Sequence, residues 1–275
     1  MRLAATDSAA GSEELVNAHG DFLELLREHG YEPFQHAAIM QSHHHSEAQV
    51  AGATIAHGTT VIAVKFKDGV LNIADRRAMA SNTILYEEAE KIMELDDYTL
   101  IAIAGSYARA VEAVRLLRHS FKYYARSQLQ ELSLEGKLNE VSRVLMRTIP
   151  ELMQGIGGFL PIVSTYDLKR DEGRIFFYDA LGARFESREY GAVGSGAERI
   201  RGALDYIVRR RHPFHEMELE EALQETMLLL DIASGIDPAT GGVDRALPLA
   251  KTITREGITT IPDEMLKELR KTLRP

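Results

Sequence analysis

The sequence of 275 residues contains no cysteine. This excludes disulfide bonds and thiolate metal sites, and it fits an intracellular compartment. Long hydrophobic runs are missing as well, because no apolar stretch approaches the ~20 residues of a membrane-spanning helix. The first residues, Met1 to Ala5, lead directly into the polar Thr6-Asp7-Ser8, so no secretory signal is predicted. We therefore expect a cytoplasmic protein that does not contact the membrane.

An excess of positive charge is also absent, since 32 Lys and Arg face 41 Asp and Glu and the net charge is -9. Phosphate binding needs a dense positive patch, so we do not expect nucleic acid as a partner. The one basic cluster, Arg209 to His212, is interpreted as a solvated helix end. The composition, 45% hydrophobic and 27% charged, is typical of soluble globular proteins. The length favours one large domain behind an N-terminal arm.

The arm, residues 1–58, differs from the rest in holding seven of the ten histidines. A helix is predicted from Ser12 to His29, with Ser12 as its cap and Gly20 weakening it. The arm is either a flexible tail or a propeptide that is later removed. A zinc site is a third possibility, but adjacent histidines point in different directions and no carboxylate or cysteine completes a set. The histidines considered for it are His36, His43, His44 and His45.

Beyond the arm, apolar periodicity predicts two groups of strands, each followed by two helices, and then a closing hairpin and a last helix. This order favours an α+β fold, an αββα sandwich of two antiparallel sheets, over a βαβ alternation. The predicted strands are Thr60–Phe66, Gly69–Asp75, Tyr98–Ala104, Leu160–Asp167, Arg174–Tyr178, Ala183–Arg188, Ala192–Gly194, Lys251–Arg255 and Ile258–Ile261. The predicted helices are Tyr107–Ser127, Lys137–Gln154, Ala197–Arg209, Glu218–Ala233 and Pro262–Leu273.

The junction between arm and domain, Gly58-Thr59-Thr60, is a candidate site of self-cleavage. Glycine has no Cβ, so a hydroxyl can approach its carbonyl closely. If the Gly58–Thr59 bond breaks, Thr59 carries both a nucleophilic hydroxyl and a free α-amine, a known pairing of nucleophile and base. Taken alone, the tripeptide also reads as the β-branched start of an ordinary strand.

Two charged residues and a glycine could complete such a site. Asp75 ends a predicted strand and Lys91 follows a polar run, and each taken alone reads as a surface residue. Together, a lysine held against a carboxylate and near a threonine hydroxyl lowers the cost of forming the alkoxide. Gly105 follows a buried strand and could direct its backbone N–H toward an oxyanion.

With these residues the chain resembles a proteasome β subunit of the bacterial, actinobacterial type, an N-terminal nucleophile (Ntn) hydrolase, from Gly58 to about Ile261. Asp75 and Lys91 stand 16 and 32 residues after Thr59, as the catalytic pair does in that family. The motifs that carry the resemblance are Gly-Thr-Thr at 58–60, Gly-Val-Leu and Ala-Asp-Arg-Arg within 69–77, Glu-Lys-Ile at 90–92, Ala-Gly-Ser at 104–106, Val-Gly-Ser-Gly at 193–196 and Asp-Pro-Ala-Thr-Gly-Gly at 237–242.

The resemblance implies that Thr59 is the nucleophile and that its freed α-amine is the base, with a reference pKa of about 7.7 to 8.0. It implies that Lys91, paired with Asp75, assists the hydroxyl, and that Gly105 binds the oxyanion. Around the amine it places Ser195, Asp237 and Thr240, with Arg77 supporting Asp75. The segment Asp231-Ile232-Ala233-Ser234-Gly235 competes for the same alignment, but the two glycines after Thr240 favour Asp237.

The resemblance also implies a pocket for the residue before the cleaved bond, which we expect to favour apolar side chains. Met79 stands where the family often has threonine, and Tyr107 stands where relatives carry a small residue. The residues expected to form this pocket are Ala78, Met79, Ala89, Met93, Ile103, Tyr107 and Val111.

We therefore expect a threonine endopeptidase made as a zymogen, which loses residues 1–58, begins at Thr59 when active, and needs no cofactor and no metal. The resemblance implies a seven-membered ring of β subunits, together with an α-subunit ring, an ATP-dependent unfoldase and unfolded polypeptides as substrates. A non-catalytic structural ring subunit is the alternative from another class, although such subunits usually lose part of the catalytic set. A simpler two-ring bacterial relative is the other alternative, but it is usually shorter and lacks the Arg76-Arg77 pair.

Overall fold

The computed structural model describes residues 59–80, 83–153 and 157–273. The predicted propeptide, its helix, its histidines and Gly58 lie outside the described residues, as does the end of the predicted helix at Gln154. The strands are β1 Thr60–Phe66, β2 Gly69–Ala74, β3 Ala78–Ala80, β4 Thr83–Tyr86, β5 Ile92–Asp96, β6 Thr99–Gly105, β7 Phe159–Asp167, β8 Glu172–Tyr178, β9 Arg184–Ser187, β10 Tyr190–Gly194, β11 Leu249–Thr254 and β12 Gly257–Thr260. The helices are α3 Tyr107–Gln128, α4 Leu134–Arg147, α5 Ile149–Met153, α6 Ala197–Arg210, the 3-10 helix η1 Phe214–Glu216, α7 Leu219–Ile236 and α8 Asp263–Thr272.

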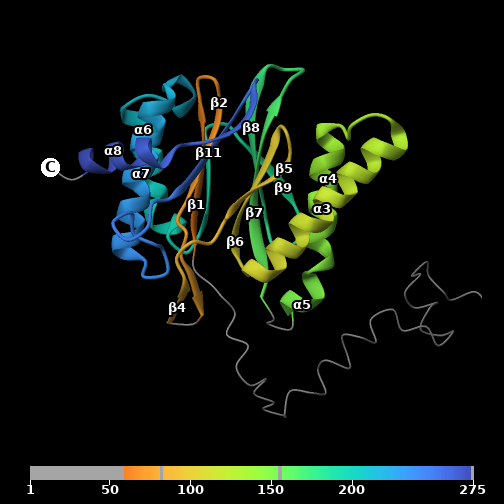
Figure 1. Ribbon diagram of the computed structural model, residues 1–275, viewed down its shortest axis with the longest axis horizontal. Coiled ribbons are helices and arrows are strands. Elements are labelled where there is room, and N and C mark those ends of the chain that lie inside the picture. Colours follow the sequence, from red (N-terminus) through yellow and green to blue (C-terminus); the bar gives the residue numbers. More distant parts are fainter. Residues whose placement is uncertain (1–58, 81–82, 154–156, 274–275) are drawn as a thin grey trace, which may run out of the picture. The chain divides into compact units, whose positions relative to one another are not determined.

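The strands form two five-stranded sheets and a separate hairpin of β3 and β4. The first sheet has the order β10-β1-β2-β11-β12 and the second the order β5-β6-β7-β8-β9. Each pairing within them is antiparallel. In Figure 1 the sheets face each other, with α6, α7 and α8 outside the first and α3 and α4 outside the second. The predicted αββα sandwich is confirmed.

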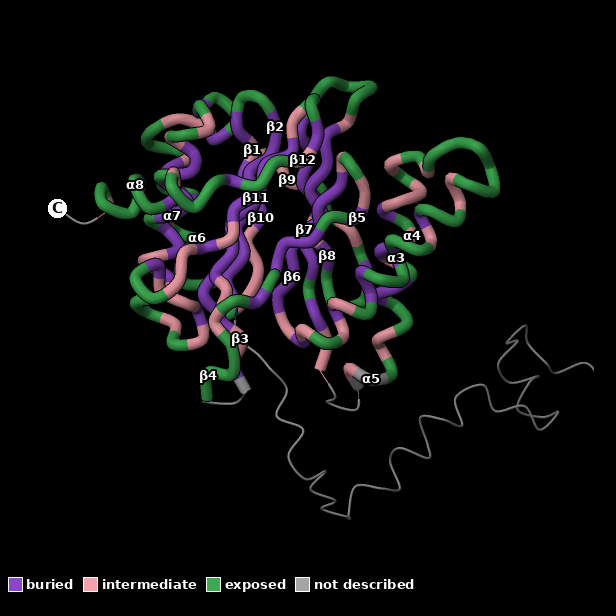
Figure 2. Tube along the Cα trace, in the orientation of Figure 1, coloured by how far each residue is buried: buried purple, intermediate pink, exposed green. Residues whose placement is uncertain are grey.

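Strand β1 shows why the two sheets stack. Successive side chains of a strand point to opposite faces. Ile62 and Val64 belong to the apolar cluster shared with α6, α7 and α8, whereas Val61 and Ala63 belong to the cluster between the two sheets. Both faces of β1 are therefore buried, and within this strand Lys65 alone is intermediate rather than buried (Figure 2).

The second sheet repeats this arrangement with the other pair of helices. Ile101 and Ile103 of β6 pack in a cluster with α3 and α4, and Leu100 and Ala102 face the first sheet. The domain thus has three apolar clusters: one between each sheet and its helices, and one between the two sheets. Strands β1 and β6 belong to the two facing sheets. This geometry allows residues distant in sequence to meet at the end of the sandwich.

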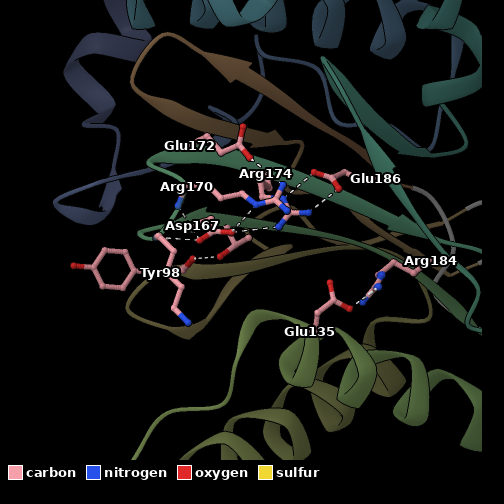
Figure 3. Close-up of polar contacts among 10 residues, drawn as sticks. Tyr98, Glu135, Asp167, Arg170, Glu172, Arg174, Arg184 and Glu186 are labelled. Atoms are coloured by element: carbon pink, nitrogen blue, oxygen red, sulfur yellow. Dashed lines mark hydrogen bonds and ion pairs between the residues drawn. The ribbon is translucent and has the colours of Figure 1, made fainter.

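Ion pairs connect strands β7, β8 and β9 of the second sheet, as Figure 3 shows. Arg174 on β8 donates to both carboxylate oxygens of Glu186 on β9, at 2.8 and 2.7 Å, and contacts Asp167 at 3.3 Å. Its guanidinium lies 5.0 Å from the ring centroid of Phe176. Bidentate pairing and stacking together restrict the Arg174 side chain, so the strand pair is held in one register.

Helix α4 differs from the prediction at both ends. It begins at Leu134, where the Ser133 side chain accepts from the Gly136 amide at 3.2 Å. It ends at Arg147, before the predicted end at Gln154, and the short α5 follows. Pro150 explains the break, because it has no N–H to continue the helix and is tolerated only in a first turn.

Strand β5 and the β3–β4 hairpin were not predicted. In the edge strand β5 the exposed Glu94 interrupts a short run of buried apolar residues, and β4 is exposed throughout, so neither shows the longer pattern by which the other strands were predicted. The strand predicted from Ala192 begins earlier, at Tyr190. Arg209 and Arg210 lie exposed at the end of α6, which confirms the predicted solvated helix end.

Candidate active site

Asp75, directly after β2, is the centre of a buried polar cluster. Its Oδ1 accepts from Lys91 Nζ at 2.9 Å and from the Thr60 backbone amide at 2.8 Å. Its Oδ2 accepts from the amides of Arg77 at 3.0 Å and Gly241 at 2.8 Å. The carboxylate is 1% exposed, and these four donors replace the hydrogen bonds that water would have made. The cluster therefore fixes Lys91 relative to the backbone next to Thr59.

Lys91 is also buried, with 2% of its surface exposed. Burial lowers the pKa of Lys91, because a charged ammonium loses its hydration. The nearby Asp75 carboxylate acts in the opposite direction, and the positive charge of Arg77 adds to the lowering. A lysine whose pKa is lowered in this way holds its proton less tightly than an exposed lysine does, which suits a group that exchanges a proton with a neighbouring hydroxyl.

A chain of hydroxyl groups connects β1 to the segment after α7. Thr60 Oγ1 lies 2.7 Å from Thr240 Oγ1, and Thr240 Oγ1 donates to Asp237 Oδ2 at 2.7 Å. Because the single Thr240 proton goes to Asp237, Thr60 donates to Thr240. Ser195 Oγ also donates to Asp237 Oδ2, at 2.5 Å. Ser195 and Thr240, two of the residues expected around the Thr59 amine, are thus joined through the third, Asp237.

The alternative segment for this role lies elsewhere. Asp231 is inside α7, whereas Asp237 is the C-terminal cap residue of that helix, where the chain turns toward β1. Arg77 holds the turn, because its guanidinium donates to the carbonyl oxygens of Pro238 at 2.9 Å and Thr240 at 3.3 Å. Pro238 can supply this acceptor because a proline lacks the backbone N–H but keeps its carbonyl oxygen.

Two glycines of the Val-Gly-Ser-Gly motif allow the backbone to approach closely. A Cβ on Gly194, whose φ is +109°, would lie 1.8 Å from the carbonyl oxygen of Thr59. A Cβ on Gly196 would lie 2.1 Å from Thr60 Oγ1 and 2.7 Å from Thr240 Oγ1. The sequence reasoning did not assign a role to Thr60, Gly194 or Gly196, although the spaced glycines were a signal of close backbone approach.

A small pocket of about 10 Å³ adjoins Thr59. Its lining residues are Thr59, Arg77, Ala78, Lys91, Ile103, Gly105 and Tyr107. We call it the first pocket. Three of the residues expected in a substrate pocket, Ala78, Ile103 and Tyr107, therefore lie together beside Thr59.

The other residues expected in the substrate pocket do not line it. Met79, Ala89 and Met93 are buried, and Met93 belongs to the cluster under α3. Val111 packs against the same cluster.

Gly105, at the end of β6, takes a φ of +108° that other residues rarely adopt. A Cβ there would lie 2.5 Å from the carbonyl oxygen of Gly158. Glycine is therefore required at this position by both conformation and space. The predicted oxyanion contact of its N–H stays a prediction.

Among the residues that the structure describes, no group of three or more His, Asp or Glu side chains is arranged to hold a metal ion. No helix within the described ranges is both long and apolar enough to cross a membrane.

Comparison with known proteins shows one consistent likeness. Residues 55–246 match the family model described as Proteasome subunit. The chain is 34% identical over 220 residues to "Proteasome subunit beta" of Streptomyces griseus, an alignment that covers 79% of this chain and 76% of that protein. It is 36% identical over 218 residues to "Proteasome subunit beta 2" of Thermomonospora curvata, covering 78% and 76%. It is 35% identical over 221 residues to "Proteasome subunit beta" of Acidimicrobium ferrooxidans, covering 79% of each.

Proposed function

Because the chain belongs to the proteasome family as a β subunit, we propose that it is a threonine endopeptidase made as a zymogen. The observation that carries the proposal is the buried Lys91–Asp75 pair, joined at 2.9 Å. Lys91 and Thr59 line the same pocket, so the pair lies beside the proposed nucleophile. A structural subunit has no need of a buried lysine with a lowered pKa at this place.

The first reaction of the zymogen would be its own cleavage. The Thr59 hydroxyl attacks the Gly58 carbonyl carbon, the peptide C–N bond breaks, and an ester forms between Gly58 and the Thr59 Oγ. Water then hydrolyses the ester, which releases residues 1–58 with a carboxylate and leaves Thr59 with a free α-amine. The α-amine is tied up in the peptide bond before this step. Lys91 lines the first pocket beside Thr59 and, unlike Arg77 in the same lining, can be deprotonated, so it would receive the hydroxyl proton.

In the mature enzyme the same hydroxyl would attack a substrate peptide. The α-amine of Thr59 takes the hydroxyl proton and later donates it to the leaving amine. The Gly105 N–H would stabilise the oxyanion. Ser195, Asp237 and Thr240 would hold the α-amine and a water molecule, because their hydroxyl and carboxylate groups already form one connected set.

Substitution of Thr59 by alanine tests the proposal. Thr59→Ala should keep the full mass of the 275-residue chain and should not cleave peptides. Thr260→Ala, an exposed threonine on β12, is the matched control and should mature and cleave like the unchanged protein. Maturation and peptide cleavage in Thr59→Ala would overturn the proposed mechanism.

A non-catalytic ring subunit is the competing function, and intact mass after assembly separates the two. Loss of residues 1–58 indicates the enzyme, and retention indicates the structural subunit. Proteasome β subunits assemble with other proteasome subunits in rings. We further propose a seven-membered β ring, an α ring, an ATP-dependent unfoldase and unfolded polypeptide substrates, in the cytoplasm. Native mass of the chain alone and with co-expressed neighbours tests this, and would also distinguish the simpler two-ring relative.

A further inference from the structure

A second pocket, of about 360 Å³, also opens at Thr59. It shares only Thr59 and Gly105 with the first pocket. Ala104 lines the second pocket and Ile103 lines the first. These two residues are consecutive on β6, so their side chains point to opposite faces of the strand. The two pockets therefore flank the end of β6, and the proposed nucleophile has one on either face.

The second pocket is mainly apolar. Gly158 and Ala180 leave space in its lining, and Leu152 and Leu160 supply large apolar side chains. Leu160 is 37% exposed, so its side chain is available to a ligand. A space of this size with apolar lining and a few polar groups is typical of sites that bind a side chain or a small ligand.

Ser195 determines which part of a substrate would enter this pocket. It lines the second pocket but not the first, and it donates to Asp237 in the set expected around the α-amine. The leaving nitrogen must approach the α-amine, because that group donates its proton. The segment after the cleaved bond thus leaves on the side of Ser195, and Lys91 lies on the other side, in the first pocket.

We propose that the second pocket binds the side chain of the residue after the cleaved bond and favours a large apolar one. The inference rests on the proposed peptidase function and adds a second specificity site to it. Leu152 and Leu160 are the specificity-determining residues. An acidic side chain is disfavoured there, because among the lining residues no basic side chain is present to pair with it.

A series of internally quenched peptides tests the pocket in the assembled, matured protein. The peptides share one sequence with leucine before the cleaved bond and differ only in the next residue, which is leucine, alanine or aspartate. We expect kcat/KM for leucine to exceed that for alanine by about tenfold, as for differences in apolar contact in other enzyme pockets, and to exceed that for aspartate by more. Rates within twofold across the series would overturn the proposal.

A substitution then assigns the effect to the pocket. Leu160→Lys should abolish the preference for leucine and improve cleavage before aspartate at least tenfold relative to leucine. Leu168→Lys, an equally drastic change at a 50% exposed leucine outside the pocket, should keep the original preference. If Leu160→Lys fails to assemble, Leu160→Ala should reduce the leucine-to-alanine ratio several-fold. An unchanged ratio in the Leu160 variants would overturn the assignment.

A peptide boronate that carries only the residues before the cleaved bond distinguishes failure of the second-pocket proposal from failure of the proposed peptidase function. Such a probe reacts with Thr59 and uses the first pocket but not the second. A protein that binds the boronate and cleaves all peptides equally refutes only the second pocket. A protein that neither binds the boronate nor cleaves peptides refutes the proposed function, and the pocket inference with it.

Discussion

Lys91 donates to the same Asp75 oxygen that accepts the backbone N–H of Thr60. One carboxylate oxygen thereby joins a lysine from the edge of the second sheet to the first strand of the other sheet. Burial raises the energy of the charged lysine, and Asp75 partly compensates for it. The contact therefore aligns the two sheets and sets the proton affinity of Lys91 at once.

The lowered pKa of Lys91 predicts how stability depends on pH. The unfolded chain keeps the lysine proton up to the ordinary value of 10.5, whereas the folded protein releases it at lower pH. Between these two pKa values the unfolded state binds more protons, so this lysine makes the free energy of unfolding rise with pH. In Lys91→Met that contribution is lost.

Urea denaturation of the unchanged protein and of Lys91→Met, at a series of alkaline pH values up to 10.5, measures this difference. The unchanged protein should gain stability relative to Lys91→Met as pH increases. A relative loss with increasing pH would show that the pKa of Lys91 is raised.

We expect the substitution of aspartate by asparagine to lower activity at Asp237 but not at Asp231. Asp237→Asn weakens the acceptor for Ser195 and Thr240. Peptide cleavage should fall by about tenfold or more, because a hydrogen bond to a charged group contributes roughly 1.5 to 3 kcal/mol. Asp231→Asn, within α7, should change kcat less than twofold. Steady-state kinetics with one peptide measures both, and equal losses would contradict the placement of Asp237.

Glycine substitutions probe the close approach at the motif around Ser195. In Gly196→Ala the new Cβ would lie 2.1 Å from Thr60 Oγ1, so the hydroxyl chain must move. We expect destabilisation by about 1 to 3 kcal/mol, as for other overpacked sites, and lower activity.

Gly202→Ala is the matched control, because a Cβ there meets nothing within 4 Å and the residue lies inside α6. It should stabilise the protein by about 0.5 to 1 kcal/mol through helix propensity. Thermal and urea unfolding measure both variants. Similar stability for the two would refute the crowding argument.

The ion pairs of Lys251 form a second polar contact between the sheets, and its contribution to the free energy of unfolding can be measured. From β11 it contacts Glu90 and Glu94 at 3.1 Å each, and its side chain is only 7% exposed. Lys251→Met should destabilise the protein by about 1 to 2 kcal/mol, less than a fully buried pair, because both carboxylates can hydrate.

The control for this link is Lys271→Met, since Lys271 contacts Glu268 on the surface with both side chains largely exposed. Its effect should be below about 0.5 kcal/mol and should vanish in high salt. Urea denaturation at two salt concentrations compares them. Equal effects would mean that Lys251 contributes only as a surface charge.

Much of the fold was predictable because a buried face of a strand or helix requires apolar residues at regular spacing in the sequence. The apolar run of β1 and the stripe of α3 both predicted their elements closely. Strand β5 was missed because the exposed Glu94 interrupts its short run of buried apolar residues. Helix α4 was predicted to continue to Gln154 but ends at Arg147, although Pro150 was a local signal of this end.

The sequence by itself determined the chemical groups of the candidate site and their order, since Thr59, Asp75 and Lys91 are recognisable from residue type and spacing. Only the tertiary structure decided which groups surround them. The amides of Arg77 and Gly241 reach Asp75 because separate segments converge at the end of the sandwich. The second pocket at Thr59 likewise draws on α5, β7 and β10. Periodicity reports which side of an element is buried, but it does not report what is packed against it, so contacts between distant segments arise only on folding.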